Sequence, residues 1–259
     1  MKKHKNGDII VKNNSERDVK MNTVKFNKRN TLVVAHRGLS GIELENTNSA
    51  FVAAGNRSYY GIETDIHKTA DGKFVVCHDD NLKRIAGEDL NVESVSLGVL
   101  QNIILTDKDG TKSRLDLRLG FLENYISICK KYEKHCVLEL KSEFTEEETA
   151  KFIEIIKSYD YLDNVTFISF HYENLVKVRE ILPNQSVQYL FVKIDDEIIE
   201  KLKYAKIDVD VYHESLTKEA VDKMHAAGLK INCWTVDKKE DAERYSEWGV
   251  DFITSNILE

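Results

Sequence analysis

The chain has 259 residues, of which 42% are hydrophobic and 31% are charged, and its formal net charge is −7 at pH 7. This length suits one sizeable domain, because α/β barrels often reach ~250 residues without dividing. The negative charge argues against a nucleic-acid-binding surface but not against a small anionic substrate, since local groups can outweigh net charge. No apolar run approaches the ~20 residues of a membrane span, and no apolar stretch follows the basic start, so we expect no signal peptide.

The cysteines predict a reducing environment. None of the four forms a CxxC pair, and each lies in or beside an apolar stretch: Cys77, Cys129, Cys136 and Cys233. We therefore expect buried free thiols and a cytoplasmic protein.

Residues 1–30 form a polar N-terminal extension, whereas residues 31–259 carry the regular patterns of one domain. Apolar residues alternate loosely in the extension: Ile9, Val11, Val19, Met21, Val24 and Phe26. A marginal hairpin packed on the domain and a disordered extension both fit this pattern.

From Leu32 onward, strand-like runs alternate with amphipathic helical stretches. The strands are expected at 32–36, 60–66, 136–141, 165–170, 187–192, 207–211, 229–235 and 250–254. The helices are expected at 47–56, 120–133, 145–158, 172–181, 195–204, 217–227 and 238–247. Such alternation predicts parallel βαβ units, and eight of them predict a (β/α)₈ barrel. The alternative is a doubly wound open sheet, which is disfavoured because no G-x-G-x-x-G turn follows the first strand.

Local signals support these elements. Thr145 is placed to cap helix 145–158, whose apolar stripe is expected at Phe152, Ile155 and Ile156, and Thr217 is placed to open helix 217–227.

Two parts of the chain depart from the βα alternation. Residues 87–119 form a small insertion after the second strand, which we expect near the barrel mouth. Only five residues follow the last expected strand. We therefore expect either a barrel without an eighth outer helix or residues 1–30 covering part of that gap.

Three carboxylates occur in apolar strands. Glu63 and Asp65 share a face because they are two residues apart on a strand, and Glu139 lies in an apolar strand expected beside theirs. The simplest alternative is a surface-facing pair on an edge strand. Burying such a pair without a partner is costly, and three clustered carboxylates form an oxygen site for a hard divalent cation. Zinc is disfavoured because no Cys/His cluster has zinc spacing.

Two histidines follow strand-like runs near these acids. His36 and His78 can serve as base and acid on opposite sides of a reacting phosphorus, although a lone buried histidine is more often a core residue. Arg37 and Lys141 can neutralise phosphate oxygens, pair with the acid cluster, or do both.

Two aromatic or imidazole side chains give weaker signals. Trp234 is either a wall of the pocket, packed on a carbon chain, or a core residue under a helix. His171 is either a site residue or the first residue of a surface helix.

These motifs resemble the glycerophosphodiester phosphodiesterase family. The resemblance rests on His36-Arg37-Gly38, Glu45-Asn46-Thr47, Glu63-x-Asp65, Thr69-x-Asp71-Gly72 and His78-Asp79-x-x-Leu82-x-Arg84. Later matches are Glu139-x-Lys141, the Cys233–Asp237 segment and the Gly249–Thr254 segment.

The resemblance implies a (β/α)₈ barrel with a small insertion and a requirement for Ca²⁺ or Mg²⁺. It implies Glu63, Asp65 and Glu139 as metal ligands and His36 and His78 as the acid–base pair. It implies phosphate contacts from Arg37 and Lys141, and a supporting or metal-touching role for Glu45.

Three departures from the family pattern occur. Leu44 replaces a proline, Thr254-Ser255-Asn256 replaces a Thr-Asp…Pro segment, and Gly120–Glu123 replaces a Thr-Leu-Glu turn. We expect the second to affect barrel closure and not catalysis.

The expected activity is hydrolysis of a small-molecule glycerophosphodiester to sn-glycerol 3-phosphate and an alcohol. Two alternatives are a phospholipase D-like enzyme acting on lysophospholipids and a catalytically silent binding barrel. The first needs an apolar pocket mouth for an acyl chain. The apolar residues of 87–110 either form such a mouth or pack inward into the insertion.

Overall fold

The fold is a closed barrel of eight parallel strands, seen in a computed structural model that describes residues 22–259. The strands are β1 (Leu32–Ala35), β2 (Gly61–Lys68), β4 (His135–Leu140), β5 (Val165–Ser169), β6 (Ser186–Phe191), β7 (Asp208–Tyr212), β8 (Ile231–Trp234) and β9 (Phe252–Ser255). β1 pairs with both β2 and β9, which closes the sheet and excludes the open-sheet alternative. A short strand, β3 (Phe74–Val76), pairs antiparallel with β2 outside the barrel.

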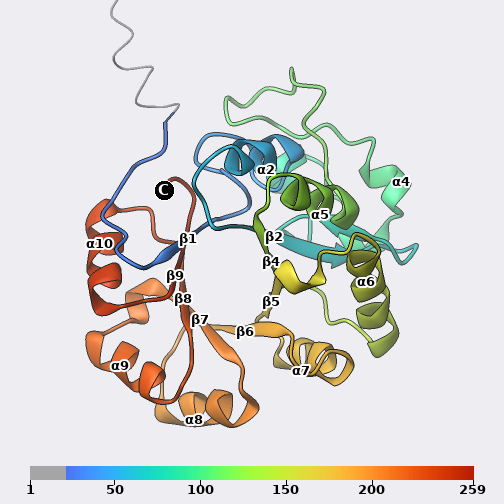
Figure 1. The fold of residues 1–259 in the computed structure, drawn as a ribbon. Coiled ribbons are helices and arrows are strands. Elements are labelled where there is room, and N and C mark those ends of the chain that lie inside the picture. Colours follow the sequence, from blue (N-terminus) through green and yellow to red (C-terminus); the bar gives the residue numbers. More distant parts are fainter. Residues whose placement is uncertain (1–21) are drawn as a thin grey trace, which may run out of the picture.

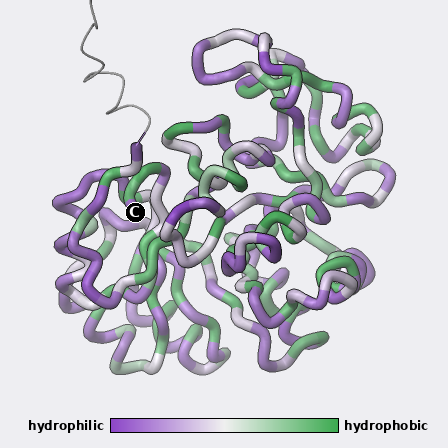
Figure 2. The backbone as a smooth tube through the Cα atoms, turned by 45° about the horizontal axis from the view of Figure 1, so that its top comes forward, coloured by the Kyte–Doolittle hydropathy of each residue, from purple (hydrophilic) through white to green (hydrophobic). Residues whose placement is uncertain are grey.

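Helices surround the barrel (Figure 1). They are α2 (Asn48–Gly55), α5 (Leu122–Lys131), α6 (Glu146–Ser158), α7 (Tyr172–Ile181), α8 (Asp196–Ala205), α9 (Lys218–Ala226) and α10 (Lys239–Trp248). Hydrophilic and hydrophobic positions alternate along these outer helices (Figure 2). The predicted (β/α)₈ architecture is therefore confirmed, with element boundaries within about two residues of those expected.

The caps show why the helices begin where they do. Thr145 Oγ1 accepts from the Glu148 backbone N–H, and Glu148 in turn accepts from the Thr145 backbone N–H, so α6 starts with a full capping box. Thr217 Oγ1 accepts from the Ala220 backbone N–H at the start of α9, which is a single cap bond without the reciprocal one. The expected stripe of α6 is wrong at one position, because Ile153 is buried and Ile155 only partly so.

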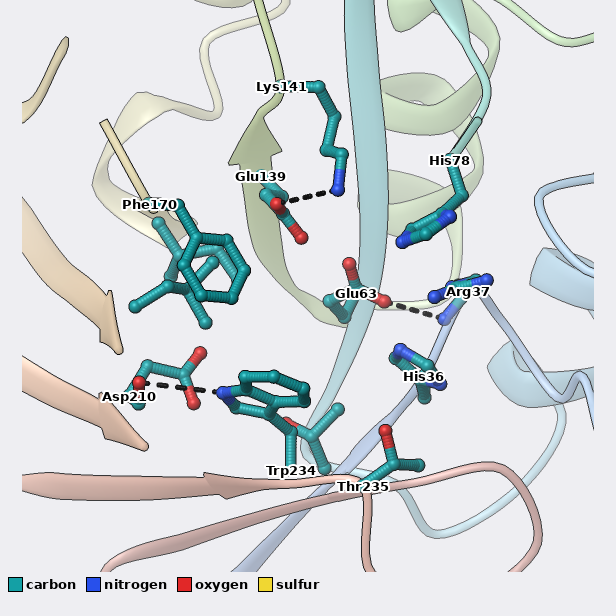
Figure 3. A pocket seen from close by; sticks show the side chains of 13 residues that line it. His36, Arg37, Glu63, His78, Glu139, Lys141, Phe170, Asp210, Trp234 and Thr235 are labelled. Carbon is teal, nitrogen blue, oxygen red and sulfur yellow. Dashed lines mark hydrogen bonds and ion pairs between the residues drawn. The ribbon is translucent and has the colours of Figure 1, made fainter. Parts of the chain in front are cut away.

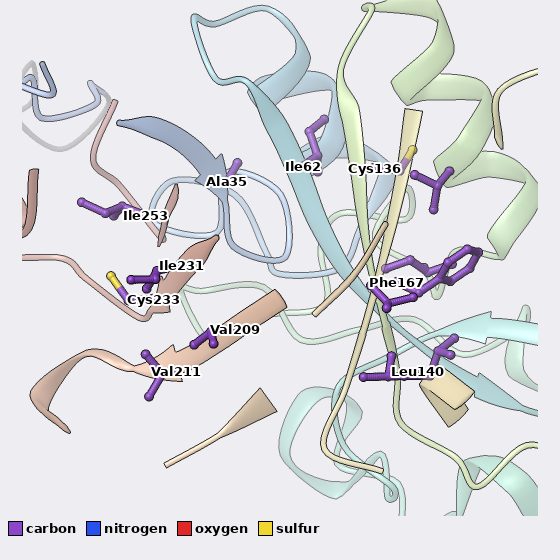
Figure 4. Close-up of a cluster of buried hydrophobic side chains, with 14 of the residues drawn as sticks. Ala35, Ile62, Cys136, Leu140, Phe167, Val209, Val211, Ile231, Cys233 and Ile253 are labelled. Carbon is purple, nitrogen blue, oxygen red and sulfur yellow. The ribbon is translucent and has the colours of Figure 1, made fainter. Parts of the chain in front are cut away.

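The main core lies between the barrel and its helices. Outward-facing strand residues such as Ile62, Phe167 and Ile231 fill it (Figure 4). A second, smaller apolar layer crosses the barrel interior and consists of Val34, Val137, Ile168 and Leu190, with Trp234 packed against it. All four cysteines are buried free thiols, as expected.

The insertion has its own small core. It contains α3 (Lys83–Ala86), the 3₁₀ turn η1 (Val92–Ser94) and α4 (Leu97–Leu100). Val92, Leu100 and Leu105 are buried there. Ion pairs and hydrogen bonds tie the insertion to loops near the pocket, including Arg114–Glu43 at 2.7 Å and Ser142–Glu93 at 2.5 Å.

Segment 22–30 lies against the last residues of the chain. Val24 bridges Leu258, and the buried Glu259 side chain pairs with Lys25 at 2.8 Å. No helix follows β9 within the part of the chain that the structure describes. The expected apolar positions Ile9, Val11, Val19 and Met21 lie outside the described residues.

Candidate active site

A pocket opens at the ends of the barrel strands, with lining residues on or directly after β1, β2, β4, β5, β6, β7, β8 and β9. Its two sides differ in chemistry (Figure 3). One side is charged and holds His36, Arg37, Glu63, His78, Glu139 and Lys141. The other side is mainly apolar and aromatic and holds Ile168, Phe170, Leu190, Asp210 and Trp234.

The three predicted carboxylates lie together on the charged side. Glu63 and Asp65 point inward from β2, and the strand register places Asp65 directly beside Glu139 on β4. Ligand oxygens of the three lie within 4.8 Å of one another. Glu63 and Asp65 are 3% and 0% exposed on a central strand, which excludes the surface-facing alternative.

Electrostatics make this cluster costly without a cation. Burial raises the pKa of Glu63 well above its usual range, and Asp65 and Glu139 raise it further. Burial and the neighbouring Asp65 raise the pKa of Glu139 to about 8, against the opposing effect of Lys141. Burial alone would also raise the pKa of Asp65, but nearby Arg37, His78 and Lys141 outweigh it and lower that pKa.

An orphaned oxygen marks where a cation fits. Asn46 Nδ2 donates to Asp65 Oδ2 at 2.8 Å, whereas Asp65 Oδ1 is buried without a hydrogen-bond partner within residues 22–259. Three clustered carboxylates, one with an unsatisfied oxygen, match the all-oxygen ligand preference of Ca²⁺ and Mg²⁺. The donor set therefore fits a hard divalent ion.

The turn after β1 brings the backbone close to these acids. Arg37 and Gly38 both have positive φ, at 54° and 75°. A Cβ at Gly38 would lie 2.7 Å from Ala50, so only glycine fits there. This turn directs the Arg37 backbone N–H to Glu63 Oε2 at 2.7 Å.

Cations surround the carboxylates. Arg37 Nη1 pairs with Glu45 at 2.9 Å, and its Nε lies 3.7 Å from Asp65 Oδ2. Lys141 Nζ lies 3.0 Å from Glu139. Glu45 also binds Arg84 through two hydrogen bonds, so its carboxylate holds two arginines in place. Arg37 therefore pairs with acidic residues and also lines the pocket, so the two roles expected for it are compatible.

His36 is oriented by a neutral amide. Its Nδ1 lies 2.8 Å from Asn256 Oδ1, and Asn256 Nδ2 donates to Asp237 at 2.6 Å. Since the Asn256 oxygen must accept, His36 carries its proton on Nδ1 and leaves Nε2 free. The Thr254–Asn256 departure, which we expected to affect barrel closure and not catalysis, also places Asn256 against the predicted acid–base residue His36.

His78 is oriented by a carboxylate instead. Its Nδ1 lies 2.8 Å from Asp79 Oδ1, and Arg84 Nε holds the other Asp79 oxygen at 2.7 Å. Burial, followed by Arg37, lowers the pKa of His36 to about 4. Burial also lowers the pKa of His78, while Asp65 and Asp79 oppose that change.

The aromatic side was only partly anticipated. Trp234 reaches the pocket and packs edge-on against Phe170, with ring centroids 5.7 Å apart. Asp210, Asn46 and Asn256 were missed, because single polar residues near strand ends carry no distinguishing spacing. His171 is exposed at the start of α7, outside the pocket lining, and pairs with Glu143 at 3.6 Å.

Comparison with known proteins agrees with this geometry. A family model described as the glycerophosphoryl diester phosphodiesterase family matches residues 36–258. The chain belongs to this family. It is accordingly a phosphodiesterase.

Individual relatives cover most of the chain. A glycerophosphodiester phosphodiesterase of Caldanaerobacter subterraneus subsp. tengcongensis is 29% identical over 87% of this chain and 94% of its own. A lysophospholipase D of Rattus norvegicus is 25% identical over 86% and 82%. An Oleispira antarctica phosphodiesterase, solved in complex with the product sn-glycerol 3-phosphate, superposes with a TM-score of 0.81 at 26% identity, covering 87% of this chain and 93% of that one.

Within residues 22–259, none of the helices has the length and apolar character required to cross a bilayer.

Proposed function

We propose that this family member hydrolyses glycerophosphodiesters to sn-glycerol 3-phosphate and an alcohol with the help of a bound Ca²⁺ or Mg²⁺. The observation that carries the proposal is a single pocket side that combines a three-carboxylate cluster with two differently oriented histidines. The product bound to the Oleispira antarctica relative supports the same substrate class.

Glu63, Asp65 and Glu139 would hold the cation. When bound, it polarises a phosphoryl oxygen and lowers the pKa of a nearby hydroxyl. The remaining chemistry belongs to the chain. Arg37 and Lys141 bind the phosphate oxygens, and Glu45 keeps Arg37 directed toward the pocket by its ion pair.

The two histidines suit different proton transfers. His36, with Nε2 free and a pKa lowered to about 4, is neutral at pH 7 and accepts the proton of the attacking hydroxyl. His78 donates Nδ1–H to Asp79, whose negative charge favours the imidazolium, as does a bound phosphate. Its Nε2–H then protonates the leaving alcohol. The attacking hydroxyl is either water or the neighbouring glycerol hydroxyl, which gives a cyclic phosphate first.

A second candidate is phospholipase D-like hydrolysis of lysophospholipids, favoured by the Rattus norvegicus relative. This activity needs an apolar pocket mouth for an acyl chain. The insertion supplies only part of one, because Val92, Leu100 and Leu105 are buried in its own core. Val99 and Leu115 remain 48% and 65% exposed on the insertion. We also propose that the insertion 87–119 influences substrate choice and that residues 1–30 form an N-terminal extension of the barrel domain.

A substrate panel separates the two candidates. Glycerophosphodiesters with different head groups and matching lysophospholipids are assayed on the same protein, before and after chelation and re-addition of metal. Faster hydrolysis of glycerophosphodiesters supports the first candidate. Faster hydrolysis of lysophospholipids, together with loss of that activity in Val99→Glu and Leu115→Glu, supports the second.

The four buried free thiols are stable in a reducing compartment. We place the enzyme in the cytoplasm on that ground.

A further inference from the structure

The aromatic side of the pocket contains one buried carboxyl that lacks a partner. Asp210 on β7 is 1% exposed and lines the pocket, yet its Oδ1 has no hydrogen-bond partner within residues 22–259. Its carboxyl lies beside the indole of Trp234, across the pocket from His36 (Figure 3). Burying a polar group without a partner is unfavourable, so this carboxyl suits a partner that arrives with the ligand.

The residues beside Asp210 are apolar or form hydrogen bonds with other groups. On the adjoining strands, Asp210 is in register with Leu190, which is apolar, and with Asn232. The Asn232 side chain donates to Gln188 and accepts from Thr254. Trp234 Nε1 is directed to the backbone carbonyl of Asp210, at 3.5 Å, and not to its carboxyl.

The surroundings of Asp210 match a hydroxyl-bearing carbon chain. Phe170 and Trp234 present apolar ring surfaces at this side, at an interplanar angle of 85°. Burial keeps the pKa of Asp210 well above its usual range, which favours the neutral acid. A neutral carboxyl both donates and accepts hydrogen bonds, which suits a hydroxyl better than an ammonium group.

We propose that Asp210 determines specificity by hydrogen-bonding a hydroxyl of the substrate's glycerol moiety, whose carbon chain packs against Phe170 and Trp234. This inference rests on the proposed phosphodiesterase function and adds a residue that recognises the organic part of the diester. Asp210 lies across the pocket from His36, the proposed base (Figure 3), so its loss should change discrimination between substrates and not the chemistry.

Two diesters with the same leaving group test the assignment. One joins 4-nitrophenyl phosphate to glycerol, and the other joins it to 1-propanol, which lacks the free hydroxyls. In Asp210→Leu, kcat/KM for the glycerol ester should fall about tenfold or more, whereas that for the propyl ester should change by less than about twofold. Asp210→Asn keeps a donor and an acceptor and should retain most of the preference.

Asp208→Asn is the matched control. Asp208 lies two residues earlier on the same face of β7 but lines a separate cavity at the opposite end of the barrel. Its variant should keep the wild-type preference for the glycerol ester. Thermal unfolding of Asp210→Leu should show a midpoint no lower than wild type, since the change removes a buried group without a partner.

Three results would overturn the proposal. Equal losses on both esters would assign Asp210 a structural role, and an unchanged preference in Asp210→Leu would assign it none. A selective loss on glycerophosphocholine, with the glycerol-to-propyl preference intact, would show that it binds a cationic head group. Calorimetric binding of glycerol 3-phosphate and propyl phosphate repeats the comparison without turnover. A wild type that hydrolyses neither ester would refute the proposed function while leaving this binding test in force.

Discussion

At the scale of single residues, the two histidines differ in what holds them. Asn256 gives His36 a neutral partner, whereas Asp79 gives His78 a charged one. A carboxylate stabilises the imidazolium and a neutral amide does so much less. This difference assigns base and acid to the two positions in our proposal, which the sequence motifs alone could not do.

Histidine variants test that assignment. His36→Ala and His78→Ala should each lower kcat by ~10²–10⁴, because each removes a positioned proton-transfer group. A 4-nitrophenyl leaving group needs little protonation, so it should rescue His78→Ala much more than His36→Ala. Steady-state kinetics on this ester and on an alkyl ester provide the comparison. Equal rescue of both variants would refute distinct roles.

Exchanging Asn256 and Asp237 tests the orientation of His36. The double variant Asn256→Asp/Asp237→Asn keeps their mutual hydrogen bond but places a carboxylate against His36 Nδ1. This should raise the pKa of His36 by about one unit or more. Because the base must be neutral, the low-pH limb of the kcat/KM profile should move to higher pH. An unmoved limb would show that another group controls it.

Glu139 links the acid cluster to stability. Its pKa is raised from 4.5 to about 8, so between these values the folded protein holds protons that the unfolded chain has released. The free energy of unfolding of the metal-free protein should therefore fall as pH rises through this window. Glu139→Gln should flatten the decline and add about 1–3 kcal/mol at pH 8.

Urea denaturation of chelated protein at several pH values measures this effect. Glu247→Gln, at an exposed pair with Arg29, is the control and should follow wild type. Parallel pH dependence in wild type and Glu139→Gln would contradict the proposed repulsion among the carboxylates.

At the scale of elements, the alternation of apolar runs and capped helices was sufficient to predict the barrel. Thr145 and Thr217 marked helix starts that the structure has one residue later. The carboxylates were predictable for the same reason, because a strand fixes which residues share a face. Asn46, Asp210 and Asn256 were not predictable, because their contacts depend on how loops and distant strands close around the pocket.

The contact between segment 22–30 and residues 255–259 is expected to stabilise the barrel near β1 and β9. Burial opposes ionisation of Glu259, but hydrogen bonds and the Lys25 pair lower its pKa to about 2. Its contribution is therefore present above pH ~4.5 and lost as the pH falls toward 2. Glu259→Gln should lower the free energy of unfolding at pH 7 by about 1–3 kcal/mol. Denaturation showing no loss would contradict this role.

At the scale of the whole molecule, the barrel gathers positive and negative side chains around one pocket. The chain carries a net charge of −7, yet Arg37, Arg84 and Lys141 gather at one end of the barrel beside the acids. The apolar layer of Val34, Val137, Ile168 and Leu190 lies inside the barrel. An anionic diester and a cation can thus share one side of a pocket, although the net charge predicts neither.

The most direct test of this account is the release of sn-glycerol 3-phosphate from glycerophosphoethanolamine by chelated protein to which Ca²⁺ or Mg²⁺ is returned. We expect no product after chelation, recovery when one of these ions is added, and no recovery in Glu63→Gln although that variant remains folded. The control variant Glu247→Gln should recover fully. Undiminished turnover after chelation, or full recovery in Glu63→Gln, would contradict the proposed metal-dependent phosphodiesterase.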